Sequence, residues 1–300
     1  MLKQLRQRIV QSLWIKYRQN NRSMQTVEKA LRQCGINQLV LDHFAIIDLP
    51  GPHSGIPQLK AIFKTLGFEQ RGSDYLVEKQ NDFLWMAERD SAESKATDAL
   101  PQVVIADFRL DQMPVEVSNI IKKYAKHTTP FPIEKLQQME QGSILAIEAA
   151  LIHYFRGRDW PMPTVKEFKT VQDFNKLLAW VLVFGRQPNH FTLSVHLLNH
   201  FADLNDFHCF IRKQTQLALN DDGGLIKGGE KTGIAQGSTR DIVEKINLHD
   251  GAIELPTGFV EFVWRYPVKP SSHHQPIWWN DYFTGFIAQH ADHVIESLYV

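Results

Sequence analysis

Two histidines and one glutamate stand inside apolar segments whose alternation is typical of strands. In residues 190–196 every second residue is polar, so His190 is expected on a polar face whose opposite face is apolar. Glu261 stands in the middle of the apolar segment 258–266, where a carboxylate needs either solvent or a partner that offsets its desolvation. His43 lies between apolar residues of a third such segment. A metal ion is one partner that would serve all three side chains.

The chemistry of this donor set is specific. Two imidazoles and one carboxylate on one side of a metal ion leave neighbouring coordination positions open, as in non-haem iron(II) oxygenases. Taken singly, each residue more often has an ordinary role, the histidines as hydrogen-bonded core or surface groups and the glutamate in solvent. Taken together, His43, His190 and Glu261 predict an Fe(2+) site, with zinc, nickel or manganese as alternatives in purified protein.

The three side chains need a scaffold that brings distant strands together. Residues 38–112 show the element order strand, helix, strand, strand, strand, and residues 186–268 repeat it. In the second unit we expect strands at 190–196, near 232–236 and at 258–266, with helices near 204–213 and 240–246. The repeated order predicts an α+β fold in which paired βαβββ modules form a cupped mixed sheet.

Three helical regions are predicted outside the two modules, and the whole chain, 1–300, is expected to be a single catalytic domain. They are N-terminal helices over 1–36, an insert over 113–184 and a C-terminal helix over 275–300. The first 22 residues contain basic residues and no acid, like some targeting segments. Apolar residues nevertheless recur at helical spacing from Leu2 to Leu13, which favours an ordinary helix that packs its apolar face on the body.

Composition excludes several classes of partner. Lys+Arg and Asp+Glu both total 33, so no excess of basic charge draws the chain onto nucleic acid or anionic lipid. The longest apolar run, residues 177–184, is far shorter than the roughly 20 residues that cross a bilayer. Cys34 and Cys209 form neither a CxxC pair nor a disulfide framework, which fits a reducing, cytoplasmic setting. We expect partners at a local site, with neither nucleic acid nor a membrane among them.

Short segments around the candidate ligands resemble one family. They are Asp42-His43-Phe44-Ala45, Asn189-His190-Phe191-Thr192, Gln236-Gly237-Ser238-Thr239 and Phe259-Val260-Glu261-Phe262. Over most of its length the sequence is similar to the 2-oxoadipate dioxygenase/decarboxylases, or hydroxyglutarate synthases, of the vicinal-oxygen-chelate superfamily, which includes glyoxalases and extradiol dioxygenases. Members with paired modules place metal ligands on the first strand of each module and on the last strand of the second.

The resemblance implies an iron(II)-dependent enzyme whose partners are O2 and a small 2-oxo acid such as 2-oxoadipate. The acid would chelate the metal through its carboxylate and keto oxygens, and oxidative decarboxylation would give a 2-hydroxy acid and CO2. For 2-oxoadipate the family product is 2-hydroxyglutarate. Gln236 and Ser238 are expected to orient the substrate, and His196 to support the site without ligating the metal.

One position departs from the family. Its better-known members have, four residues after the first histidine, an arginine that holds a substrate carboxylate, and this chain has Ile47 there. An apolar side chain cannot make the charge-assisted hydrogen bonds of an arginine. Either another cation replaces it, with Arg265 as the first candidate, or the substrate differs at its far end. Arg265 is equally compatible with a surface arginine that covers the sheet.

Two other functions fit the same residues. The first is a glyoxalase-like isomerase, lyase or hydrolase that uses zinc, nickel or manganese as a Lewis acid. The second is a non-catalytic protein that binds a metal or a small ligand in the cup, because one fold serves many functions. Consumption of oxygen separates the dioxygenase from both.

Overall fold

The computed structural model describes residues 2–138, 143–268 and 277–298. Within them, one curved mixed sheet contains β1 (Leu41–Ile47), β2 (Phe68–Leu76), β3 (Asn81–Glu88), β4 (Gln102–Phe108), β5 (His190–Ser194), β6 (Lys227–Gly229), β7 (Ile234–Ser238) and β10 (Phe259–Arg265). Their order across the sheet is β2-β3-β4-β1-β5-β10-β7-β6. β8 (Val243–Asn247) and β9 (Ala252–Pro256) form a separate hairpin.

The two halves of the sheet repeat one arrangement. In the first, β1 pairs in parallel with β4, and β3 and β2 follow in antiparallel order. In the second, β5 pairs in parallel with β10, β10 pairs antiparallel with β7, and β7 pairs antiparallel with β6. A helix follows the first strand of each half, α3 (Ile56–Thr65) and α9 (Leu204–Thr215). The predicted α+β fold of paired βαβββ modules is therefore confirmed, and the modules meet where β1 pairs antiparallel with β5.

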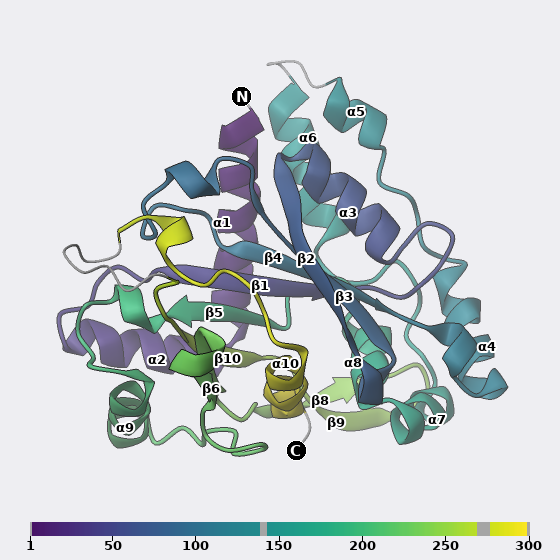
Figure 1. Ribbon diagram of the computed structural model, residues 1–300. Helices are drawn as coiled ribbons and strands as arrows, with labels where there is room; N and C mark the ends of the chain where they lie inside the picture. The colour runs from purple at the N-terminus through teal and green to yellow at the C-terminus, as the bar shows by residue number, and fades with distance from the viewer. Residues whose placement is uncertain (1, 139–142, 269–276, 299–300) are drawn as a thin grey trace.

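Helices cover both faces of the sheet (Figure 1). Besides α3 and α9, the described α-helices are α1 (Leu2–Asn20), α2 (Arg22–Gln33), α4 (Val115–Ala125), α5 (Ile133–Gln137), α6 (Ile144–Tyr154), α7 (Val165–Phe174), α8 (Lys176–Phe184) and α10 (Ala288–Ile295). α1 crosses one face, where its apolar side chains are buried against the sheet as expected. α10 lies on the other face, against β2, β6 and β7.

The helix predicted near residues 240–246 is wrong, because residues 243–247 form β8 and residues 240–242 belong to neither a helix nor a strand. Exposed and half-buried residues alternate along β8, which is the period of a strand, and a turn leads into β9 with a hydrogen bond of 2.7 Å from Leu248 N to Gly251 O.

The C-terminal helix predicted over 275–300 is shorter than expected. It begins at Ala288 and ends at Ile295, while residues 275–276 and 299–300 lie outside the described part of the chain. In the preceding segment the carboxylate of Asp281 accepts hydrogen bonds of 2.9 and 2.8 Å from the backbone N–H groups of Ile277 and Trp278. These bonds lie at the N-terminus of the short 3-10 helix Trp279–Asp281, which stands where the first part of a longer α-helix was predicted.

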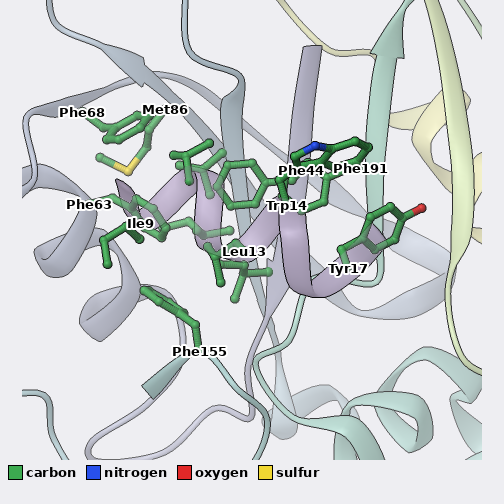
Figure 2. Packing of buried hydrophobic residues seen from close by; sticks show 14 of the residues in the cluster. Ile9, Leu13, Trp14, Tyr17, Phe44, Phe63, Phe68, Met86, Phe155 and Phe191 are labelled. Atoms are coloured by element: carbon green, nitrogen blue, oxygen red, sulfur yellow. The ribbon is translucent and has the colours of Figure 1, made fainter. Parts of the chain in front are cut away.

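An aromatic stack holds β1 and β5 together on the α1 side of the sheet (Figure 2). The ring of Phe44 stacks on the ring of Phe191 at 4.9 Å, and Trp14 of α1 meets Phe191 edge-on at 5.3 Å. Phe44 and Phe191 are fully buried. Because neighbouring residues of a strand point to opposite faces, this packing places His43 and His190 on the face away from α1.

We expect Phe191→Ala to lower the free energy of unfolding by about 3–5 kcal/mol, because it removes a fully buried ring that contacts three others. Val115→Ala is the control, since Val115 is 76% exposed and its truncation should change stability by less than about 0.5 kcal/mol. Urea unfolding followed by circular dichroism gives both values. An equally small loss in the two variants would mean that the stack does not stabilise the sheet.

Candidate metal centre

The side chains of His43, His190 and Glu261 converge on the face of the sheet away from α1. They come from β1, β5 and β10, which are consecutive strands of the sheet. The Oε2 atom of Glu261 lies 3.1 Å from Nε2 of His43 and 3.2 Å from Nε2 of His190. One donor atom from each residue lies within 4.8 Å of the others, and all three residues are buried. We call these residues the three candidate ligands.

Hydrogen bonds to both imidazoles fix which ring nitrogen faces the centre. Nδ1 of His43 lies 2.8 Å from Oδ1 of Asp42, and Nδ1 of His190 lies 2.8 Å from Oδ1 of Asn189. Both oxygens are acceptors, so each Nδ1 carries a proton, and each Nε2 faces Glu261, where its deprotonated form can bind a metal ion. Nε2 of His190 is buried without a hydrogen-bond partner among the described residues. A metal ion would satisfy this atom, and metal-binding histidines are commonly oriented in this way.

Two neutral side chains orient the carboxylate of Glu261. The amide of Gln236 donates to Oε1 at 2.7 Å, and the hydroxyl of Thr192 donates to Oε2 at 2.9 Å. Glu261 itself is 1% exposed. The carboxylate therefore keeps one orientation relative to the two imidazoles, as the ligand of a metal ion requires.

The charges at the centre favour a cation. Burial alone would raise the pKa of Glu261, but His43 and His190 hold this pKa well below its usual range. Burial alone would lower the pKa of His43, whereas Glu261 and Asp42 raise it to about 9. Burial lowers the pKa of His190. Glu261 thus remains ionised in a buried site, where a divalent cation can offset its charge as the proton of His43 does.

Arg265 lies at one end of this arrangement and does not line a cavity with the candidate ligands. Its Nε and Nη2 donate to the two carboxylate oxygens of Asp42 at 2.7 and 2.8 Å, and its Nη1 donates to the backbone oxygens of Phe283 and Gly285. Arg265 is 4% exposed, so it is not a surface arginine. All three guanidinium nitrogens are used within the protein, which is not the arrangement of a substrate-binding cation. The guanidinium instead positions Asp42, and its charge holds the pKa of that buried carboxyl well below its usual range.

The other predicted site residues separate into two groups. Ile47 and Gln236 line a cavity together with the three candidate ligands. Ser238 does not line it, and its hydroxyl lies 2.8 Å from that of Ser297. His196 contacts Arg265 and not a candidate ligand, because its Nδ1 accepts a hydrogen bond of 3.4 Å from the backbone N–H of Arg265. Its predicted supporting role would therefore act through Arg265 and not through a ligand.

Sequence reasoning overlooked the roles of Asp42, Asn189 and Phe286. A shared signal was present, since each candidate histidine directly follows a residue whose side-chain oxygen can accept a hydrogen bond. Phe286, whose ring meets the His43 ring edge-on at 4.7 Å, gave no such signal. Its position depends on how residues 277–287 pack against β1 and β3, which are distant in the sequence.

Comparison with known proteins agrees with this geometry. A sequence model of the 2-oxoadipate dioxygenase/decarboxylase family matches residues 8–266. The chain belongs to this family. The family resemblance seen in the sequence is therefore confirmed.

Named relatives and one solved structure extend the comparison. The chain is 26% identical to a chloroplastic 2-oxoadipate dioxygenase/decarboxylase of Arabidopsis thaliana, over 94% of this chain and 74% of the relative. It is 24% identical to a chloroplastic/amyloplastic one of Oryza sativa subsp. japonica, over 94% and 75%. The crystal structure of the hydroxyglutarate synthase from Oryza sativa in complex with 2-oxoadipate has the same fold, with a TM-score of 0.77, 21% identity and coverage of 97% of this chain and 90% of that one.

The relatives leave the cellular location of this protein open. Both plant proteins carry organelle names, whereas the sequence of this chain predicts a cytoplasmic setting. No helix among the described residues is long and apolar enough to span a membrane.

Replacement of Glu261 by Gln should remove most metal binding and leave the fold intact, because an amide of the same shape cannot act as an anionic ligand. The exposed Glu254→Gln on β9 is the control for loss of one negative charge. Metal per chain after reconstitution with iron(II), measured by inductively coupled plasma mass spectrometry, compares them. Equal metal content in the two variants would remove Glu261 from the ligand set.

Arg265→Lys should weaken metal affinity by roughly 10-fold to 100-fold, because a lysine cannot grip both oxygens of Asp42 and so leaves the His43 imidazole less well oriented. Arg240→Lys is the control, since Arg240 forms an exposed ion pair with Asp221. Competition with a chelating dye reports the dissociation constant. A folded Arg265→Lys protein with wild-type affinity would show that this contact does not support the site.

Proposed function

We propose that this protein is an iron(II)-dependent enzyme that uses O2 to decarboxylate a 2-oxo acid, with His43, His190 and Glu261 as the metal ligands. One observation carries the proposal, namely that these three buried side chains converge at a cavity in a chain of the 2-oxoadipate dioxygenase/decarboxylase family. Three protein ligands on one side of a metal leave room for a chelating substrate and for oxygen.

Bound iron(II) would supply open coordination positions for the carboxylate and keto oxygens of the substrate and the redox chemistry with O2. The overall reaction balances when a 2-oxo acid and O2 give CO2 and a 2-hydroxy acid one carbon shorter. No second organic reductant is needed, because the substrate itself provides the electrons. Both oxygen atoms of O2 are accounted for in the products.

The protein's own groups would bind, orient and shield the substrate. Oε1 of Gln236 is buried without a hydrogen-bond partner among the described residues, and Gln236 lines the cavity. This oxygen is an acceptor suited to a hydroxyl donor, which the 2-hydroxy acid product has and the keto group of the substrate lacks. The apolar walls around it exclude water from the reacting centre and so limit side reactions.

The composition of the cavity favours oxygen chemistry over a glyoxalase-like isomerase, lyase or hydrolase. Such enzymes need a group that transfers a proton to or from the substrate. Apart from the three candidate ligands, the polar residues that line the cavity in the described part of the chain are Asn81, Asn189 and Gln236. Their amides do not titrate, so acid–base catalysis would have to use a metal ligand or a metal-bound water.

An oxygen electrode tests the proposal directly. Protein reconstituted with iron(II) under anaerobic conditions should consume oxygen when mixed with oxygenated buffer and a 2-oxo acid from a panel that includes 2-oxoadipate. Oxygen consumption should equal CO2 release, and Glu261→Gln should reduce the rate by at least about 100-fold.

Three control results would contradict the proposal. Equal turnover without oxygen would indicate an isomerase, lyase or hydrolase. Equal activity of the zinc-loaded protein would exclude redox chemistry at the metal. Tight binding of the acids without any turnover would indicate a binding protein.

A further inference from the structure

The cavity beside the candidate ligands has one polar end and otherwise apolar walls. Strands β1 to β4, the segment before α10 and α10 itself contribute apolar side chains, which include Ile47, Leu76, Phe83, Val104, Phe286 and Val294. No lysine or arginine lines the cavity within the described part of the chain. A substrate chelated at the polar end would extend its tail between these apolar side chains.

The amides at the cavity offer little to an anion. Nδ2 of Asn81 donates to the backbone oxygen of Asp107 at 2.8 Å, and Nε2 of Gln236 donates to Glu261 at 2.7 Å. The amide oxygen of Asn189 accepts from His190, while its Nδ2 is a buried donor without a hydrogen-bond partner among the described residues. Within the described part of the chain, the cavity therefore offers a second carboxylate one unpaired neutral donor, beside His190, and no lysine or arginine.

Buried cations near the cavity have partners elsewhere. Arg265 grips Asp42. Lys79 forms ion pairs with Asp292 and Glu296. Lys227, which is the register neighbour of Gln236, donates to the backbone oxygen of Asn220 at 3.0 Å and does not line the cavity.

We infer, on the basis of the proposed function, that the substrate of this chain is a monocarboxylic 2-oxo acid with an uncharged, apolar tail. A distal carboxylate would lose its hydration without gaining a charged partner, and burial of a charge without a partner is strongly unfavourable. A distal methyl group gains free energy from the same burial. The apolar walls thus favour an uncharged tail, while the metal would bind the 2-oxo acid group.

A matched pair of acids tests the inference. 2-Oxohexanoate and 2-oxoadipate have the same chain length and differ only in a terminal methyl group or carboxylate. We expect kcat/KM for 2-oxohexanoate to exceed that for 2-oxoadipate by at least about 100-fold in the iron(II)-loaded protein. Calorimetric titration of the zinc-loaded protein without oxygen should show the same order of affinity, and this measurement does not depend on turnover.

Ile47→Arg should move the preference toward 2-oxoadipate by at least about tenfold, because a guanidinium in the cavity can pair with the distal carboxylate. Ile47→Met is the control, since it lengthens the same side chain without adding a charge. Thermal unfolding shows whether each variant is folded. If Ile47→Arg does not fold, the comparison of the two acids in the wild-type protein decides the inference alone.

Outcomes for the inference and for the proposed function are distinguishable. A wild-type protein that binds or turns over 2-oxoadipate as well as 2-oxohexanoate overturns the inference and leaves the proposed function in place. Oxygen consumption with neither acid contradicts the proposed function, while the calorimetric preference still decides the inference. Binding of neither acid overturns the inference.

Discussion

The alternation of side chains along β1 and β5 is the constraint on which the site depends. Phe44 and Phe191 stack in the core under α1, so the preceding histidines must lie on the opposite face. A slip of one residue in either strand would expose an aromatic ring and bury an imidazole on the wrong side. The hydrophobic core therefore fixes the position of the candidate ligands before any metal is involved.

Electrostatic balance is the second requirement. The centre buries two carboxylates, Asp42 and Glu261, and each needs a cation to offset its desolvation. The guanidinium of Arg265 balances the charge of Asp42 and donates two hydrogen bonds to its carboxylate. Within the described part of the chain, Glu261 contacts imidazoles and neutral donors, and Lys227 interacts with it only at longer range. A metal ion or a proton on His43 would therefore balance its charge at close contact. His43 connects the two carboxylates, because its Nδ1 bonds to Asp42 and its Nε2 faces Glu261.

Local periodicity predicted the strands and the strand face of each candidate ligand, because alternation depends on residues within a few positions of each other. The grouping of the three ligands came from the chemistry of the donor set and from the family resemblance. Local periodicity failed where distant contacts decide the structure. Residues 243–247 formed a hairpin strand, because their weak alternation gained a partner only in β9. The position of Phe286 depends on how residues 277–287 pack against distant strands, which short-range patterns do not encode. Asp42 and Asn189 were detectable, because both immediately precede a candidate histidine.

Strand direction explains why Arg265 cannot replace a cation at position 47. Four residues along a strand span roughly 13 Å, so Ile47 and Arg265 each lie about that far from the ligand of their own strand. β10 is parallel to β5, and β5 is antiparallel to β1, so β10 and β1 run in opposite directions. Ile47 and Arg265 therefore lie on opposite sides of the row of candidate ligands. Arg265 reaches the end of β1 where Asp42 precedes His43, while Ile47 extends into the apolar cavity. For the proposed function, support of the metal centre and recognition of the substrate tail would thus lie at opposite ends of the same strands.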